Sequence, residues 1–549
     1  MGSIKTDLPK DVVDAIQQME DRADECFRTL GLLAYPVDLA IWGLLAGGIA
    51  LVEREIMHRG DNAPHLSATL LNVSRVVPVA IKWATKHGKP PAAPAGRRWT
   101  ADLAAKADEA LNLANDYATF ETCFPMWHRD RNLAELVSPT LVRFTAPGVA
   151  RNRQVSAYQK GFRPKEGSFN AIRVEKVNST RVVQALFDTA LQTSRMTGRL
   201  CFEYGDCFTL WRELIPEYQA RLSAITRRAT GLSLGEYTLG DFNKFYAAFL
   251  AVCAAHEYLC YAWGRFINRV YPFESAVMVR SAQSWSNIIS ELCGLSESAC
   301  QSIVADLTFD FDRSFDLHVH PFVPIDGTAA NLAVAPQFPL GSRPDENILR
   351  VCSILRPDVF DAASSQKEAE MLSDLRKRCP VRSIDGPIAL PSPTPDVDLL
   401  VVDEASSTVL IAELKWIRKT LRPVEMTDRD AEVLKGINQL RSIGDFLAKN
   451  PAYLVEQRRS PRQLADYKRV EYVLVARDHW LWVEPGDGLA IVEFEAFVIS
   501  LGRSSSLGSA VDELLAYDWL PVEGRDFRVQ YDRATANGVS IESQVFYPV

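Results

Sequence analysis

The sequence predicts an α+β chain of several domains, in which a mostly α-helical N-terminal region precedes a compact α/β domain. Three observations predict this organisation. The chain has 549 residues, which is too many for one hydrophobic core. Apolar residues recur at helical spacing through much of the first 305 residues. Beyond residue 345, the segments follow the order helix, strand pair, helix, strand, which is typical of an α/β domain.

Residues 1–305 form the predicted helical region. Helical spacing runs through 10–85 and resumes at 100–117, and a Pro/Ala-rich stretch within 88–98 separates the two parts as a surface loop. Residues 140–145 look like a short strand. Further along, the pattern predicts long amphipathic helices at 182–193, 208–227, 239–267 and 276–292.

Residues 306–344 change character and predict a strand-rich connector. Two segments within it, 315–321 and 331–338, have the composition of strands and are bounded by proline-rich turns. The sequence therefore predicts that the helical region ends near residue 305.

Residues 345–505 form the predicted α/β domain. Two helices over 343–355 and 362–378 precede strands at 397–402 and 408–416, which a turn at 403–407 joins. A helix at 428–447 and a strand at 470–476 follow. The remaining residues, 506–549, are predicted to be an extension with a strand pair at 527–531 and 543–547.

Composition limits the function. Hydrophobic residues make up 47% of the chain and charged residues 24%, as in globular proteins that dissolve in water. The formal net charge of −8 argues against a DNA-binding charge spread over the whole surface, yet it allows a local basic cleft. The N-terminal sequence has no apolar signal core, and the apolar stretch Leu39–Val52 is too short to span a bilayer. We therefore expect a cytoplasmic protein with no membrane association.

The ten cysteines include no C-x-x-C pair. Three pairs lie six or seven residues apart and are the candidates for a zinc site, but we favour the interpretation that the cysteines are small buried apolar residues in a reducing compartment. The pairs are Cys201 and Cys207, Cys253 and Cys260, and Cys293 and Cys300.

One strand carries the residues that suggest chemistry. Glu413 and Lys415 are two residues apart, so they share one face of the 408–416 strand with Ile411, while the alternate residues give the other face an apolar surface. The hairpin brings Asp398 towards both of them. Two carboxylates that converge with a lysine make an oxygen-ligand site suited to Mg²⁺.

The string Pro395-Asp396-Val397-Asp398, followed after fourteen residues by Glu413-Leu414-Lys415, resembles the signature of the PD-(D/E)XK nuclease superfamily. The resemblance covers roughly residues 362–480. It implies a restriction-endonuclease-like domain with a central mixed sheet, and a cofactor that is Mg²⁺ or, alternatively, Mn²⁺. It also implies Asp398 and Glu413 as metal ligands and Lys415 as their electrostatic partner.

In that superfamily, a glutamate on the first helix often completes the metal site. The helix offers Glu368 and Glu370. Glu368 lies on the face of Met371, Leu372 and Leu375, whereas Glu370 falls nearly opposite. We therefore expect Glu368 to point inward as an accessory ligand.

The second helix resembles several branches of the superfamily at Lys435 and Gln439. The resemblance makes Gln439 a candidate site residue, while Lys435 fits a solvated helix flank equally well. Ile443 stands where a tyrosine often follows, so the chain departs from the RecB-like branch at this position.

Several clusters of basic residues flank these elements. They could contact phosphates around a cleft, although each alone is also typical of an ordinary solvated surface. The clusters are Arg376–Arg378, Arg418–Lys419 with Arg422, Arg458–Arg459 with Arg462, and Lys468–Arg469.

Two other motifs suggest different enzymes. His318-Val-His320 has the spacing of metal-dependent amidohydrolases, but the preceding helices do not fit their barrel. Gly231-Leu-Ser233-Leu-Gly235 matches a nucleophile elbow, which needs a strand before it, yet here the pattern predicts a helix. No G-x-x-x-x-G-K-[ST] string occurs, so no ATP motor is indicated.

The sequence thus predicts a metal-dependent nuclease that hydrolyses phosphodiester bonds, with DNA favoured over RNA as substrate. The helical region would control or target it and could supply contacts for a homo-oligomer or a partner protein. Defence against foreign DNA is the favoured context by analogy. The alternative is a non-catalytic regulatory or scaffold protein that binds nucleic acid or protein on a nuclease fold.

Overall fold

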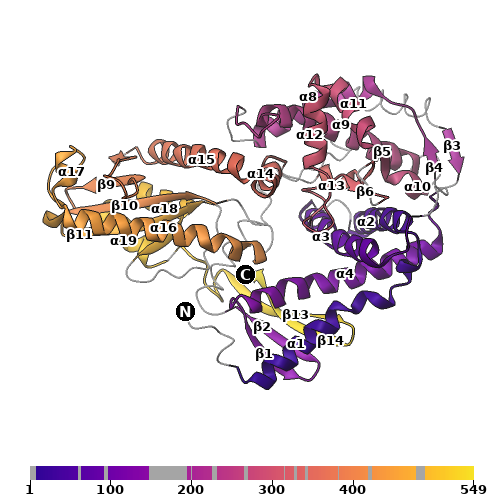
Figure 1. Cartoon of the computed structure of the whole chain (residues 1–549), viewed down its shortest axis with the longest axis horizontal. Coiled ribbons are helices and arrows are strands. Elements are labelled where there is room, and N and C mark those ends of the chain that lie inside the picture. Colours follow the sequence, from indigo (N-terminus) through magenta and orange to yellow (C-terminus); the bar gives the residue numbers. More distant parts are fainter. Residues whose placement is uncertain are drawn as a thin grey trace.

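The computed structural model describes most of the chain. The described residues are 8–59, 63–91, 97–146, 195–198, 201–225, 231–264, 270–314, 316–326, 330–340, 344–380, 383–417, 423–477, 489–517 and 519–549. The chain is a mixed α/β protein with a helical N-terminal region. Figure 1 shows the helical parts on the right and an α/β unit on the left.

The first helices are α1 (Lys10–Asp24), α2 (Val37–Arg59), α3 (Ala63–His87) and α4 (Ala101–His128). They surround a hydrophobic core to which α2 contributes residues such as Trp42 and Leu45. The apolar stretch 39–52 is thus a core helix, as the sequence predicts. The Thr100 hydroxyl begins α4 by accepting a hydrogen bond from the Leu103 amide at 3.2 Å.

A four-stranded sheet joins the two ends of the chain. It contains β1 (Leu133–Ser138), β2 (Leu141–Thr145), β13 (Phe527–Ala536) and β14 (Val539–Pro548) in the order β1-β2-β14-β13. The predicted strands at 140–145, 527–531 and 543–547 lie within it. β14 pairs parallel to β2, and α4 contacts both β13 and β14. The last residues therefore return to the N-terminal region (Figure 1).

A second helical body follows. Its helices are α8 (Phe208–Ile225), α9 (Leu239–Ala262), α10 (Phe273–Ala276), α11 (Ala282–Cys293) and α12 (Glu297–Asp306), and β3 (Arg195–Gly198) pairs with β4 (Cys201–Glu203) beside them. Helix α9 is long and apolar enough to cross a membrane, but 83% of its most apolar window is buried inside the protein. The predicted helix at 182–193 lies outside the described residues.

One prediction in this region is wrong and two are only partly right. Residues 278–281 form β5 (Met278–Ser281) instead of helix, because they pair with β7 (Asn331–Val334), which also pairs with β6 (Val323–Pro324). The predicted strand at 331–338 ends at Val334 and gives way to α13 (Gln337–Leu340). The predicted strand at 315–321 is a turn, because the Asp316 carboxylate accepts a hydrogen bond from the His318 amide at 2.8 Å and the backbone folds back on Asp316.

Helix α14 (Pro344–Leu355) leads from the second helical body into the α/β unit. It contacts α9 and α12 on one side and α15 (Pro357–Arg378) on the other. Its buried residues Ile348 and Cys352 belong to a hydrophobic core that continues into the α/β unit. The two parts of the molecule therefore share one continuous apolar core.

The α/β unit has a mixed five-stranded sheet in the order β12-β11-β10-β9-β8. The strands are β8 (Ile384–Asp385), β9 (Leu399–Asp403), β10 (Thr408–Trp416), β11 (Arg469–Arg477) and β12 (Ala490–Glu493). Strand β10 is central, antiparallel to β9 and parallel to β11. Its bounds match the predicted strand 408–416, and the predicted 470–476 strand lies within β11.

Helices cover both faces of this sheet. Helices α15, α18 (Phe494–Arg503) and α19 (Leu507–Leu515) pack on one face, and α16 (Pro423–Lys449) packs on the other. The short helix α17 (Tyr453–Glu456) follows α16. The sheet is thus the middle of three layers.

The turn between β9 and β10 is stabilised by its own residues. One Asp403 carboxylate oxygen accepts from the Ala405 amide at 3.1 Å, and the other accepts from the Ser406 hydroxyl at 2.8 Å. The second oxygen also accepts from the Leu507 amide at 2.8 Å, which ties the turn to α19.

Candidate active site

The β9–β10 pairing fixes the carboxylates of the site. The register pairs Ala412 with Leu399, so Asp398, the residue before β9, lies opposite Glu413. The Asp398 carboxylate accepts a hydrogen bond from the Leu414 backbone amide at 2.9 Å. Asp398 is therefore held against β10 by the backbone of the strand that carries Glu413. Asp396 lies outside this pair and accepts from the Leu390 amide at 3.2 Å.

The two faces of β10 differ as the sequence predicts. Leu410, Ala412 and Leu414 contribute to the core under α15, α18 and α19. Val409 and Ile411 contribute to the core under α16. Glu413 and Lys415 continue this second face, so a carboxylate and an ammonium project towards α16 from a central strand.

Glu413 and Lys415 form a buried ion pair. The distance from Lys415 Nζ to Glu413 Oε1 is 2.7 Å. The Lys415 side chain is only 13% exposed and the Glu413 side chain only 2%. Glu413 Oε2 is buried and has no hydrogen-bond partner in the described part of the structure. An unpartnered carboxylate oxygen at this depth is costly, so this oxygen is free to bind a ligand.

Burial and mutual repulsion shift the pKa values of the acids. Burial raises the pKa of Glu413 to about 8, with a further contribution from the charge of Asp398, while Lys415 opposes the shift. Burial also raises the pKa of Asp398, while the Leu414 amide and Lys415 oppose it. The charge of Asp398 therefore favours a protonated Glu413 when no cation is bound.

Lys415 keeps its positive charge. Burial disfavours the ammonium, but the carboxylates of Glu413, Glu368 and Asp398 together outweigh that effect and raise the pKa of Lys415. Lys415 is therefore a donor of hydrogen bonds and a point charge, and it is unsuited to accept a proton at neutral pH.

The two glutamates of α15 point in different directions. Glu368 Oε1 lies 4.0 Å from Lys415 Nζ, and burial raises the pKa of Glu368. Glu370 lies away from the site and pairs with Lys367 Nζ at 2.7 Å. The helical phase that selects Glu368 over Glu370 thus agrees with the geometry.

Helix α16 approaches the site through Gly436. A Cβ atom on Gly436 would lie 2.8 Å from Leu474 Cδ1 and 3.3 Å from Lys415 Cε, so a side chain there would displace Leu474 and crowd Lys415. Gln439 lies one turn further along, and its Oε1 is buried with no hydrogen-bond partner among the described residues. Lys435 is exposed, but its charge still lowers the pKa of Glu368.

Gly436 was missed in the sequence, although a signal for it existed. Glycine inside a helix costs about 1 kcal/mol relative to alanine, so its presence indicates a close approach.

The carboxylates suit a cation that takes few ligands from the protein. Within the described ranges, no group of three or more His, Cys, Asp or Glu residues could hold a metal ion by itself. Asp398 and Glu413 come together, whereas Glu368, the third predicted ligand, faces the Lys415 ammonium. Mg²⁺ often binds one or two carboxylates and completes its shell with water and substrate phosphates, and the unpartnered Glu413 Oε2 fits such a site.

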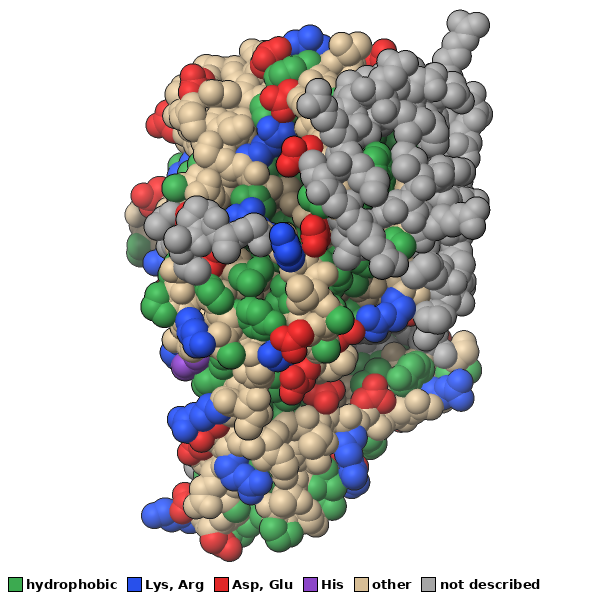
Figure 2. All heavy atoms as spheres, turned by 90° about the vertical axis from the view of Figure 1, so that its right-hand side faces the viewer, with side chains coloured by type: hydrophobic (Ala, Val, Ile, Leu, Met, Phe, Trp, Pro, Cys, Tyr) green, Lys and Arg blue, Asp and Glu red, His purple; other side chains and the backbone are tan. Residues whose placement is uncertain are grey.

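Most of the predicted basic clusters are committed to contacts within the protein. Arg376 donates to the Gly386 carbonyl at 2.7 Å, Arg378 pairs with Glu495 at 2.7 Å, and Arg459 pairs with Asp385 at 3.1 Å. Arg462 donates to the Glu404 carbonyl at 3.1 Å, and Arg469 pairs with Glu471 at 2.7 Å. Arg418, Lys419 and Arg422 lie outside the described residues. Figure 2 faces the helical side of the molecule, away from these clusters, and shows basic and acidic side chains interspersed over the described surface there.

The His318-Val-His320 motif forms a different buried cluster. His318 Nδ1 lies 3.2 Å from Asp316 Oδ1, and Arg75 Nε lies 3.6 Å from Asp316 Oδ2. Asn347 donates to the His318 carbonyl at 2.8 Å, which links the turn to α14. Burial lowers the pKa of His320 to about 4, so this imidazole stays neutral at physiological pH.

The other competing motifs also have structural placements. The Gly231–Gly235 string lies in a loop between α8 and α9, where Ser233 forms a bridge with Thr238 and no described strand precedes it. The ten cysteines, all of which lie within the described residues, form no disulfide, and all but Cys201 and Cys293 are buried.

No family model matches the chain, and no curated protein or solved structure is significantly similar to it.

Proposed function

We propose that the α/β unit is a metal-dependent nuclease of restriction-endonuclease-like fold, which hydrolyses phosphodiester bonds with DNA favoured over RNA. The observation that carries this proposal is the buried Asp398–Glu413–Lys415 cluster on the central strand, with one carboxylate oxygen left unpartnered. The element order α15, β9, β10, α16, β11 supports it, because the PD-(D/E)XK motif lies on the hairpin between the two helices.

Asp398 and Glu413 would hold the cation, which is Mg²⁺ or alternatively Mn²⁺. When bound, the cation would lower the pKa of a water molecule and offset the negative charge of the phosphorane-like transition state. Both carboxylates must be ionised to hold it. The proton that Glu413 keeps in the free protein must therefore leave when the cation binds.

Lys415 would bind and orient the reacting groups. As an ammonium it can donate a hydrogen bond to a non-bridging oxygen of the scissile phosphate or to the attacking water. Gly436 keeps it in place by allowing α16 to pack against its side chain. Gln439 Oε1 is a buried acceptor that would orient a donor of the substrate or the water.

Glu368 is the remaining carboxylate beside Lys415. We assign it a supporting role as an accessory ligand or as the acceptor of the proton that the attacking water loses. Its side chain is 29% exposed, so it can exchange protons with solvent.

The other residues would decide when and where the nuclease acts. None of the proposed catalytic groups lies in residues 1–340, and we propose that this region targets the α/β unit or controls it through a partner protein or a second copy of the chain. A cytoplasmic role in defence against foreign DNA follows by analogy with the superfamily.

The experiment compares full-length wild type with Asp398→Ala, Glu413→Ala and Lys415→Ala on plasmid, linear duplex, single-stranded DNA and RNA. Each reaction contains Mg²⁺, Mn²⁺ or a chelator, and Glu456→Ala on α17 serves as an exposed control. We expect cation-dependent cleavage that each site variant reduces by about 100-fold or more. Wild-type cleavage in all three variants would refute the proposal.

A non-catalytic protein on the same fold is the second candidate. It is favoured by the lack, within the described residues, of a group of three metal-binding side chains. Several arginines also form ion pairs within the protein, which makes them less available to bind the phosphates of a nucleic acid. Binding of nucleic acid or a partner without cleavage of any substrate by wild type would support this candidate.

A further inference from the structure

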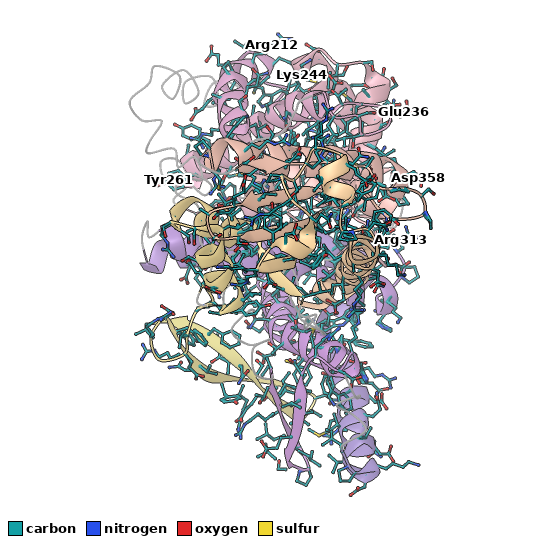
Figure 3. All side chains as sticks on the ribbon, turned by 90° about the vertical axis from the view of Figure 1, so that its left-hand side faces the viewer. Arg212, Glu236, Lys244, Tyr261, Arg313 and Asp358 are labelled. Carbon is teal, nitrogen blue, oxygen red and sulfur yellow. The ribbon has the colours of Figure 1, made fainter. Side chains whose placement is uncertain are left out.

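The helix that carries Glu368 is anchored to the second helical body by an arginine. Arg356 immediately precedes α15 and forms an ion pair with Asp306, the last residue of α12. Arg356 also donates to the Tyr237 hydroxyl at 3.3 Å, and that hydroxyl donates to Asp306 at 2.5 Å. Glu236 and Asp358, which adjoin this cluster in the sequence, lie towards the same side of the molecule in Figure 3.

The loop before α9 is shaped to admit this arginine. Gly235 has a backbone φ of +96°, and a Cβ atom there would lie 3.2 Å from Arg356 Nη1. The last glycine of the Gly-x-Ser-x-Gly string therefore has a structural explanation, which is the close approach of Arg356.

The helix that carries Gly436 and Gln439 is anchored to the N-terminal helices in the same way. Arg131 follows α4 and forms an ion pair with Asp430 on α16. The Arg131 side chain is 23% exposed and the Asp430 side chain is 7% exposed, so the pair is mostly withdrawn from water. Helices α4 and α16 are in contact around this pair.

Both anchored helices reach the candidate site as continuous helices. Asp430 is buried on α16, as are Val433, Ile437 and Leu440 further along the helix. Gln439 is nine residues beyond Asp430, or ~13 Å along the helix. Glu368 is twelve residues beyond Arg356, or ~18 Å along α15. Both α15 and α16 pack against β10, the strand of Glu413 and Lys415.

Ion pairs of this kind fix geometry more than they add stability. Removing two charges from water costs free energy that their attraction largely offsets, so a buried pair contributes little net stability. The arrangement is nevertheless specific, because each charge is well satisfied only when its partner is in place. Such pairs can therefore set the position of a helix relative to the body on which it rests.

We propose that Arg356–Asp306 and Arg131–Asp430 act as two clamps that set the positions of α15 and α16 at the site, which makes these four residues positioning residues for the metal and for Lys415. This inference rests on the proposed function. It assigns a physical route by which the helical region acts on the α/β unit. The Arg356–Asp306 clamp sets the distance of Glu368 from Lys415. The Arg131–Asp430 clamp sets how Gly436 and Gln439 pack over Lys415.

The test uses the full chain with Arg131→Met and Arg356→Met, and it adds the charge-reversed double variant Arg131→Asp with Asp430→Arg. Arg459→Met is the matched control, because it breaks an arginine–aspartate pair that lies wholly within the α/β unit. Calorimetric titration with MnCl₂ measures affinity and proton release, and cleavage assays measure kcat and KM separately. Hydrogen exchange reports on residues 357–370 and 430–440.

We expect Arg131→Met and Arg356→Met to lower Mn²⁺ affinity by about tenfold, as loss of residues that orient metal ligands does. We also expect kcat to fall by a larger factor than any change in KM. The charge-reversed pair should recover part of the loss, and Arg459→Met should behave like wild type. Unchanged affinity and kcat in both single variants, or an equal loss in Arg459→Met, would overturn the proposal. If a methionine variant does not fold, Arg131→Lys and Arg356→Lys keep the charge and carry the same test.

Failure of the proposed function has a different signature. A wild type that neither binds Mn²⁺ nor cleaves would refute the nuclease, and the clamps would then be judged by hydrogen exchange alone. Faster exchange around Glu368 and Gln439 in the clamp variants, and not in Arg459→Met, supports the clamps. Unchanged exchange at these residues overturns them.

Discussion

Two buried polar clusters in this molecule each hold side-chain atoms without a hydrogen-bond partner in the described structure, and they differ in the elements that they tie together. At the turn 316–320, Asp316 accepts hydrogen bonds from the His318 amide and its ring, and His318 is tied through its carbonyl to Asn347. Near the end of β10, one carboxylate oxygen of Glu413 pairs with Lys415, and the other has no hydrogen-bond partner in the described structure.

The difference lies in which element the cluster serves. The Asp316 cluster holds together α3, a turn and α14, because the Leu317 amide donates to the Ser74 carbonyl at 3.0 Å and Asn347 belongs to α14. The Glu413 cluster sits on a central strand that is already held by two neighbours and needs no further support. Buried polar groups that add no structural tie to a well-supported strand are the better candidates for function.

The largest expected difference between the two clusters appears when one carboxylate is removed from each. Asp316→Ala should destabilise the protein by about 3–5 kcal/mol, because Arg75 and the His318 amide lose a buried partner, while activity per folded molecule stays unchanged. Asp398→Ala should abolish cleavage and leave stability equal or increased, because it relieves the repulsion with Glu413. Denaturant unfolding and cleavage assays on the same preparations measure both, and matching behaviour of the two variants would contradict the distinction.

The two clusters should also respond to pH in opposite directions. The pKa of Glu413 in the folded chain, about 8, lies above its ordinary value of 4.5, so its stabilising contribution is complete below pH 4.5 and is lost as the pH rises through 8. The pKa of His320, about 4, lies below its ordinary value of 6.5, so its contribution is present above pH 6.5 and is lost as the pH falls through 4.

Glu413→Gln and His320→Gln separate these contributions. Relative to wild type without metal, Glu413→Gln should become progressively more stable between pH 5 and 9, by on the order of a few kcal/mol. The difference between wild type and His320→Gln should change only between pH 4 and 6.5. Calorimetric midpoints at a fixed scan rate measure both differences, and a pH-independent difference for Glu413→Gln would show that its carboxyl is not held protonated.

A smaller effect tests the support of Lys415 by α16. Gly436→Ala should lower the free energy of unfolding by about 1–3 kcal/mol, because the added methyl group clashes with Leu474. The higher helix propensity of alanine should offset up to ~1 kcal/mol of this loss. The variant should also be less active, because the methyl group displaces Lys415. Gly444→Ala in the same helix is the control, because its Cβ would lie 3.5 Å from Tyr472 Cε1, an ordinary contact. Equal activity of the two variants would show that the close approach at Gly436 is irrelevant to the site.

The smallest expected effect concerns the two glutamates of α15. Glu368→Gln should reduce cleavage by about tenfold, because it removes a carboxylate beside Lys415, whereas Glu370→Gln should affect cleavage little. Initial rates at saturating Mg²⁺ compare them. A larger loss in Glu370→Gln would contradict the supporting role assigned to Glu368.

Local sequence determined the hairpin that carries the site. The period-two pattern of 408–416 gives β10 its exact bounds and separates Glu413 and Lys415 from the apolar face. The helical period of α15 likewise distinguishes Glu368 from Glu370. Both results depend on residues within a few positions of each other, and periodicity reports on such residues directly.

Tertiary structure decided what depends on distant partners. β14 pairs with β2 across almost four hundred residues, which no local pattern indicates. β5 is a strand only because β7 lies beside it, so a helical pattern over 276–292 was misleading. Gly436 and the arginines of the two proposed clamps matter through residues that the chain brings to them from elsewhere. The sequence by itself specifies each element and the faces it presents, because those follow from short-range geometry, and only the folded chain determines which faces and charges meet, because that depends on packing over the whole molecule.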